Sequence, residues 1–193
     1  MKTLLLVRHA HTEMAGRFCG HSDPELSNNG CQQLPEIVAQ LQKWQFSTIF
    51  SSDLKRAVQT AEAIASQLSL SIQFRTGLRE INFGDWEGNS WKEIEAADPA
   101  FASSWLKEYP YKTPPRGEAF CDFENRVRNE LAELAGFVDS SDKVAVAVTH
   151  AGFIRTALSL ISGTPIASVG ATDYGSVTEL ELVRQEWSVK SSL

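Results

Sequence analysis

Two of the four histidines in this sequence stand directly after short apolar runs: His9 ends LLLVRH, and His150 ends VAVAVTH. A neutral imidazole nitrogen is a nucleophile near pH 7, and a phosphoryl group bound to it is readily passed to water. Arg8 adjoins the first histidine and Arg56 follows a third apolar run, and guanidinium groups bind phosphate oxygens through paired N–H donors. Two histidines and two arginines brought together would form a phosphate site.

Phosphate ester chemistry also needs an acid, because a leaving alkoxide has to be protonated. Glu80 follows a further predicted strand and is the carboxylate best placed to supply that proton. A lone histidine at a strand end is more often structural than catalytic, and Glu80 would look the same in the sequence if it only paired with Arg75 or Arg79. The combination of two strand-end histidines with two arginines nevertheless favours the catalytic interpretation. Fixed guanidinium groups can stabilise a transferring phosphoryl group, so we expect no metal and no other cofactor.

Alternating strand and helix patterns predict how these residues are positioned. Apolar runs rich in β-branched residues predict strands buried on both faces, over residues 3–7, 48–51, 71–74 and 143–149. Helical patterns between them are expected to be capped by Asn28 or Asn29 and by Ser52 or Asp53, and a third helix is expected over about 118–138.

This order predicts an α/β fold, a three-layer sandwich with a mostly parallel central sheet and helices on both faces. Residues 177–183 predict a late edge strand. Neighbouring parallel strands lie about 4.8 Å apart and their carboxyl ends share one edge, which is where ligands bind in such sheets. The two histidines and two arginines are therefore expected at one sheet edge.

The composition describes one ordinary folded domain over residues 1–193. Of the 193 residues 42% are hydrophobic, and the formal net charge is −6, which argues against binding nucleic acid or a membrane surface. The apolar stretches are far shorter than the ~18 residues of a membrane span, and no signal peptide is recognisable, so we expect a cytoplasmic location. Three cysteines without metal-ligand spacing predict reduced thiols. The sequence leaves a homodimer open.

Four motifs, in order, resemble those of the histidine phosphatases of the phosphoglycerate mutase-like superfamily. They are Arg8-His9-Ala10, residues 52–61, residues 78–80 with 83–88, and residues 149–152, which together cover nearly the whole chain. The resemblance implies that His9 is the nucleophile, that Glu80 is the proton donor, and that Arg8, Arg56 and His150 form the phosphate pocket. It also places Thr12 at the phosphate. Two positions depart from the pattern, Ala10 in place of glycine and Ala15 in place of a phosphate-binding asparagine.

Within that superfamily, residues 115–127 and 83–87 are most similar to the α-ribazole phosphatases of cobalamin nucleotide-loop assembly. Eight of the chain's 18 aromatic residues fall within residues 81–120, which we expect to form a lid-like helical insert over the site. Such an insert could stack a benzimidazole base, with Trp91, Trp105 and Glu118 binding the substrate. Ordinary packing of the aromatic residues is an equally valid interpretation.

Three alternatives stay open from the sequence. A broad-specificity phosphatase or a phosphoglycerate mutase-like enzyme would carry the same motifs. A metal hydrolase could use His9 and His11, but only His21 and His150 remain as further histidine ligands. A catalytically inactive scaffold would keep the fold without the chemistry.

Overall fold

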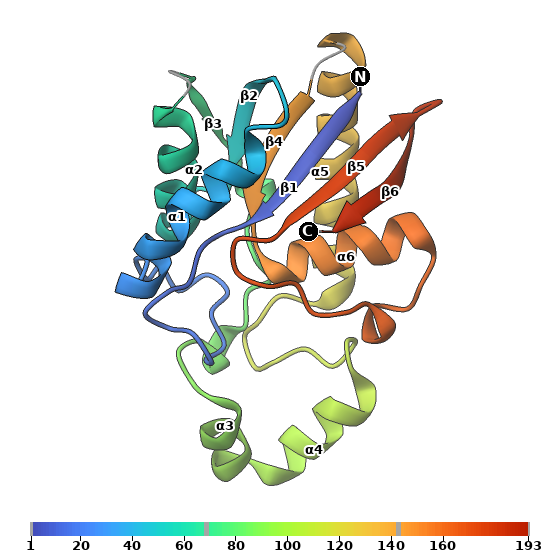
Figure 1. Ribbon diagram of the computed structural model, residues 1–193. Helices are drawn as coiled ribbons and strands as arrows, with labels where there is room; N and C mark the ends of the chain where they lie inside the picture. The colour runs from blue at the N-terminus through green and yellow to red at the C-terminus, as the bar shows by residue number, and fades with distance from the viewer. Residues whose placement is uncertain (1, 68–69, 142–143, 193) are drawn as a thin grey trace.

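The computed structural model describes residues 2–67, 70–141 and 144–192, and its centre is one six-stranded sheet (Figure 1). The strand order is β3-β2-β4-β1-β5-β6. The strands span Thr3–Arg8 (β1), Phe46–Ser51 (β2), Ile72–Phe74 (β3), Val144–Thr149 (β4), Val177–Val183 (β5) and Glu186–Ser192 (β6). Strands β1 to β4 pair in parallel, while β5 runs antiparallel to β1 and β6 antiparallel to β5. The predicted α/β fold with a mostly parallel sheet is confirmed.

Helices cover both faces of this sheet, as the three-layer prediction requires. Helices α1 (Asn28–Leu41) and α2 (Lys55–Ser66) pack on the face that carries Leu5, Val7 and Val146. Helices α5 (Phe120–Ser141) and α6 (Ala151–Ser162) pack on the opposite face, against Leu6 and Ala147. Because successive strand residues point to opposite faces, β1 and β4 feed both cores and are buried along their length.

Two strand predictions were wrong in detail. Strand β5 does not form the sheet edge, because β6 pairs with its outer side through a turn at Arg184 and Gln185. Both turn residues have positive φ, 52° and 67°, a conformation that usually selects glycine or asparagine, so residues 184 and 185 carry no recognisable turn signal. Strand β3 was expected to be buried on both faces, but it lies at the other edge and leaves Phe74 54% exposed.

The predicted helix caps were also wrong. Ser27, not Asn28 or Asn29, caps α1, with its side chain accepting a hydrogen bond from the Gly30 N–H at 3.1 Å. Helix α2 begins after Leu54 and has no side-chain cap, because the Ser52 and Asp53 side chains bond other groups.

Residues 76–108 form two short 3₁₀ turns and two helices beyond the carboxyl ends of the parallel strands (Figure 1). The turns are η1 (Thr76–Leu78) and η2 (Gly84–Trp86), and the helices are α3 (Trp91–Ala97) and α4 (Pro99–Glu108). A third turn, η3 (Ile166–Ser168), follows α6. A separate apolar cluster holds α3 and α4 together: Trp86, Ile94 and Ala102, with Phe18, Phe83, Trp91, Phe101 and Trp105 around them. Much of the aromatic content is therefore the packed centre of this segment.

Among the described residues, no helix is long and apolar enough to cross a membrane.

Candidate active site

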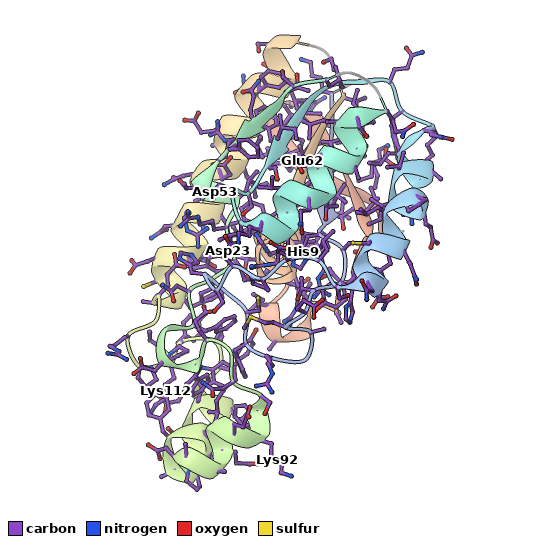
Figure 2. All side chains as sticks on the ribbon, turned by 90° about the vertical axis from the view of Figure 1, so that its left-hand side faces the viewer. His9, Asp23, Asp53, Glu62, Lys92 and Lys112 are labelled. Carbon is purple, nitrogen blue, oxygen red and sulfur yellow. The ribbon has the colours of Figure 1, made fainter. Side chains whose placement is uncertain are left out.

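The carboxyl ends of β1, β4 and β2 bring the predicted residues together. His9 follows β1 and continues its pairing, since its N–H donates to the Thr149 carbonyl of β4 at 3.0 Å. His150 follows β4, and the ring centroids of the two histidines lie 5.0 Å apart. Ser52 follows β2, with its N–H bonded to the Val148 carbonyl at 2.9 Å. Figure 2 shows His9 between the sheet with its helices and the segment that carries Lys92 and Lys112.

The hydrogen bonds of His9 define its tautomer. Nδ1 lies 2.7 Å from the Ala10 carbonyl, which can only accept, so Nδ1 carries the proton and Nε2 keeps a lone pair. Nε2 lies 3.3 Å from Nε of Arg56. Burial and then the Arg56 charge hold the pKa of His9 well below its ordinary value. The ring is therefore neutral near pH 7, and its unprotonated Nε2 accepts a hydrogen bond from Arg56.

His150 is held neutral by a similar arrangement. Its Nδ1 accepts from Arg56 Nε at 3.2 Å, which leaves Nε2–H to donate to the Ser52 hydroxyl at 2.9 Å. Burial, and after it the charge of Arg56, lowers the pKa of His150 well below its ordinary value. One guanidinium N–H thus lies against both rings.

Arg56 is fully buried in the first turn of α2, the position that the sequence predicted. Its remaining donors bond three backbone carbonyls of one loop: Ser22 at 2.7 Å, Gly20 at 2.7 Å and Cys19 at 3.3 Å. These bonds fix the orientation of the planar group beside the histidines.

Arg8 is held by a segment that the sequence did not single out. Its Nη1 donates to the Thr172 carbonyl at 2.5 Å, and the Tyr174 ring stacks on the guanidinium with its centroid 3.7 Å from Cζ. The same ring lies 5.6 Å from His9 and 5.1 Å from His11, centroid to centroid. Arg8 Nε is buried and makes no hydrogen bond within the protein. The stacked tyrosine lies in a loop without periodic pattern, so only its aromatic type could have hinted at this contact.

Glu80 is 7% exposed and lies against the start of α6. Its Oε1 accepts from the Ile81 N–H at 3.0 Å, and Oε2 accepts from the Gly152 N–H at 2.8 Å. Burial raises the pKa of this carboxyl, although the two N–H donors oppose the rise. A Cβ on Gly152 would lie 2.1 Å from Oε1, so the close approach of the carboxylate requires glycine there.

Two cavities meet at Glu80. The smaller, of about 260 Å³, is lined by Arg8, His9 and Thr12 among others, and the larger, of about 540 Å³, lies between α4, α5 and α6. Phe18, Glu80 and Phe83 line both cavities. The larger has a mainly aromatic and aliphatic wall: Phe18, Ile81, Phe83, Trp105, Leu106, Tyr109, Phe120, Phe123 and Ile166. A phosphate beside His9 would therefore have a large apolar space on the side of Glu80.

The three residues expected to bind the substrate outside its phosphate group line two different cavities. Trp105 and Glu118 line the larger cavity, but the Glu118 carboxylate is already paired with Arg126 at 2.8 Å. Trp91 does not line the larger cavity; it lines the smaller one with Arg8 and packs in the aromatic cluster. Its place follows from contacts with Phe18 and Trp86, which no local pattern shows.

The two departures from the family pattern differ in consequence. Ala10 does not have positive φ, so its Cβ fits, and its N–H donates to the Thr60 hydroxyl at 3.1 Å. Ala15 is not among the residues that line the smaller cavity, whereas Thr12 lines it and accepts a hydrogen bond from the Met14 N–H at 3.2 Å.

His11 bonds the Ser27 hydroxyl through Nδ1 at 2.8 Å, and His21 bonds the Glu80 carbonyl through Nε2 at 3.1 Å. In the part of the chain that the structure describes, no three His, Cys, Asp or Glu side chains form a group that could hold a metal ion.

Comparison with known proteins agrees with this fold. The family model of the histidine phosphatase superfamily (branch 1) matches residues 4–192, and the chain belongs to this superfamily. Over 190 residues the chain is 32% identical to glucosyl-3-phosphoglycerate phosphatase of Mycobacterium tuberculosis, a match covering 93% of this chain and 85% of that protein. It is 29% identical over 164 residues to adenosylcobalamin/α-ribazole phosphatase of Escherichia coli, with 84% and 80% covered.

Solved structures show the same similarity. The α-ribazole phosphatase of Shigella flexneri superposes with a TM-score of 0.87 at 25% identity, covering 97% of this chain and 94% of that one. The relatives named here are phosphatases, which hydrolyse phosphoric monoesters, so the chain is an enzyme of that class.

The Tyr174 contact predicts how tightly an oxyanion binds beside His9. Replacing the ring in Tyr174→Leu removes the stack on Arg8, and we expect the inhibition constant for orthovanadate to rise about fivefold to thirtyfold, from a cation–π contact of roughly 1–2 kcal/mol. Tyr174→Phe keeps the stack and is the control; it should stay within about twofold of the parent. Equal inhibition constants for Tyr174→Leu and the parent would show that the stack contributes nothing to oxyanion binding.

Proposed function

We propose that this protein hydrolyses phosphate monoesters of a bulky, mainly apolar alcohol through a phosphohistidine at His9, and that α-ribazole 5′-phosphate is its substrate. The observation that carries the proposal is the larger apolar cavity, which shares Phe18, Glu80 and Phe83 with the cavity beside His9. The phosphoryl group would lie in the smaller cavity and the leaving alcohol in the larger.

The first half-reaction follows from this placement. The Nε2 lone pair of His9 attacks phosphorus, and the bond from phosphorus to the ester oxygen breaks. Arg8 and Arg56 bind the oxygens of the transferring group and stabilise their charge. Glu80, whose pKa burial raises, gives its proton to the departing oxygen at the boundary between the cavities.

The second half-reaction returns the enzyme to its starting state. A water enters where the alcohol has left, Glu80 takes its proton, and the water oxygen attacks phosphorus as the bond to His9 Nε2 breaks. Neutral His150 accepts from Arg56 through Nδ1 and adds no second charge to the pocket. The products are inorganic phosphate and the free alcohol.

The aromatic wall supports a flat leaving group. Phe18, Phe83 and Trp105 surround the space next to Glu80, and offset or edge contacts of an aromatic base with such rings add to the area it buries. The similarity to the Escherichia coli adenosylcobalamin/α-ribazole phosphatase supports the same substrate and a place in cobalamin biosynthesis. Cytoplasmic location stays a prediction from the sequence.

A second candidate is glucosyl-3-phosphoglycerate, the substrate in the name of the mycobacterial relative. Its sugar and carboxylate would need polar partners, and the cations at the larger cavity are Lys112 and Arg155. Arg155 Nη2 already donates to the carbonyls of Ile166 and Val169, at 2.9 and 3.2 Å. The mainly apolar wall therefore favours the base over the sugar acid.

A substrate panel tests the proposal. We expect kcat/KM for α-ribazole 5′-phosphate to exceed that for ribose 5-phosphate at least tenfold, because stacking is worth roughly 1 kcal/mol beyond the area buried. Glucosyl-3-phosphoglycerate and 3-phosphoglycerate complete the panel. Equal values for ribose 5-phosphate and α-ribazole 5′-phosphate would overturn the substrate assignment, and a higher value for glucosyl-3-phosphoglycerate would replace it with the second candidate.

Trp105→Ala removes part of the aromatic wall and should erode this preference while leaving 4-nitrophenyl phosphate hydrolysis within about twofold. The matched control is Tyr111→Ala, which changes a 77% exposed aromatic residue outside the larger cavity. If both variants change the preference equally, the wall does not select the base.

The role of Glu80 predicts a dependence on the leaving group and on pH. Glu80→Gln should lower kcat/KM for an alkyl phosphate about 100-fold but much less for 4-nitrophenyl phosphate, whose leaving oxygen needs no acid. The parent needs the carboxyl protonated, so kcat/KM should fall as pH rises through its raised pKa, and the variant should lack that alkaline decline. Equal losses for both esters would contradict the assignment, and Glu118, in the same cavity wall, would become the next candidate acid.

A further inference from the structure

A second carboxylate, Glu87, lies behind the loop that holds Arg56. Its Oε1 accepts from the N–H groups of Gly20, His21 and Phe83, at 3.1, 2.9 and 3.0 Å. Its Oε2 accepts from Gly20 and Ser22, both at 3.0 Å. One half-buried side chain thus gathers four backbone donors, three of them from consecutive residues of one loop.

The same loop turns its carbonyls toward Arg56. The Cys19 carbonyl and the Gly20 N–H belong to one peptide unit, whose oxygen accepts from Arg56 and whose N–H donates to Glu87. The Gly20 carbonyl and the His21 N–H form the next unit, which bridges the two side chains in the same way. A peptide unit carries a dipole of about 3.5 D, so each is aligned between a negative and a positive group.

The electrostatics explain why such a bridge is needed. Arg56 is fully buried, and among residues 2–67, 70–141 and 144–192 it makes no direct ion pair. A buried charge is costly unless it is hydrogen-bonded and compensated. Burial alone would raise the pKa of Glu87, but the donors from Ser22, Phe83 and His21 outweigh it and hold the pKa below its ordinary value. The carboxylate is therefore charged near pH 7.

We propose that Glu87 is a positioning residue of the phosphatase reaction, acting through the peptide units of Cys19–Gly20–His21 to hold the Arg56 guanidinium against His9 and His150. A carboxylate in direct contact with Arg56 would neutralise the charge that phosphate has to meet. The peptide bridge keeps the anion behind the loop and leaves the cation against His9 and His150. This inference rests on the proposed role of Arg56 in phosphate binding.

The loop geometry makes the bridge specific. A Cβ on Gly20 would lie 2.0 Å from the Ile81 carbonyl oxygen and 2.4 Å from Glu87 Oε1. Only glycine lets the backbone come this close to the carboxylate. Ile81 directly follows Glu80, so the loop at Gly20 also packs against the chain next to Glu80.

The test compares Glu87→Gln with the control Asp85→Asn. Glutamine cannot accept from all four N–H groups, so Arg56 should shift, and kcat/KM for 4-nitrophenyl phosphate should fall about 100-fold, as for an ångström-scale misplacement. As Arg56 moves away, the pKa values of His9 and His150, followed by NMR in the free protein, should rise by about one unit. Asp85, two residues earlier, pairs with the exposed side chain of Arg116. Asp85→Asn should change kcat/KM by no more than twofold and the two histidine pKa values by no more than about 0.2 units, roughly the spread of an uncoupled surface change.

A double-mutant cycle with Arg56→Lys separates positioning from a general structural role. If Glu87 acts through Arg56, Glu87→Gln should weaken orthovanadate binding about tenfold or more in the parent but less than twofold in the Arg56→Lys background. Glu87→Asp, which keeps the charge, should lie between the parent and Glu87→Gln, and it replaces Glu87→Gln in the cycle should that variant fail to fold. Losses that multiply, or histidine pKa values that do not move, would overturn the inference. The NMR measurement needs no substrate, so an inactive parent protein would refute the proposed function while the positioning role was still tested.

Discussion

The burial of one guanidinium group is the constraint on which the rest of this site depends. Arg56 is inaccessible to solvent, yet Nε reaches two imidazoles and its Nη atoms reach three carbonyls. Each of the three guanidinium nitrogens thereby has at least one partner, as a stable buried cation requires. The same charge reinforces the neutrality that burial imposes on His9 and His150. A neutral imidazole nitrogen and a buried guanidinium can lie side by side for this reason.

The fold supplies this arrangement through two levels of support. Parallel pairing of β1, β4 and β2 sets His9, His150 and Ser52 side by side at one sheet edge. The second level is the segment beyond that edge, whose aromatic cluster includes Phe18. The Phe18 N–H donates to the Asn89 carbonyl of this segment, and the Phe18 carbonyl accepts from the Gly88 N–H. The loop that binds Arg56 is therefore packed onto the segment that forms the wall of the larger cavity. The residues that we propose bind phosphate and those that we propose contact the leaving group are therefore structurally connected.

The sequence predicted what local pattern and topology determine. Buried runs identified the parallel strands, and their carboxyl ends identified the convergence of Arg8, His9, Arg56 and His150. Contacts between distant loops escaped prediction: Tyr174 reaches Arg8 only because the chain before β5 folds back, with the Gly175 N–H bonded to the Arg8 carbonyl at 3.1 Å. Strand β6 was missed because its turn lacks glycine or asparagine, and β5 was therefore wrongly placed at the edge. Tertiary contacts decided each of these cases, as they did for Trp91.

Trapping the covalent intermediate tests the central claim most directly. A substrate carrying a radiolabelled phosphoryl group would be mixed with the enzyme, quenched in alkali, and the labelled peptide identified. A phosphohistidine nucleophile predicts label on the peptide that contains His9, stable in alkali and lost in acid, while His9→Ala takes up no label and loses nearly all turnover. Label that survives acid, label on another residue, or turnover that survives His9→Ala would contradict the account.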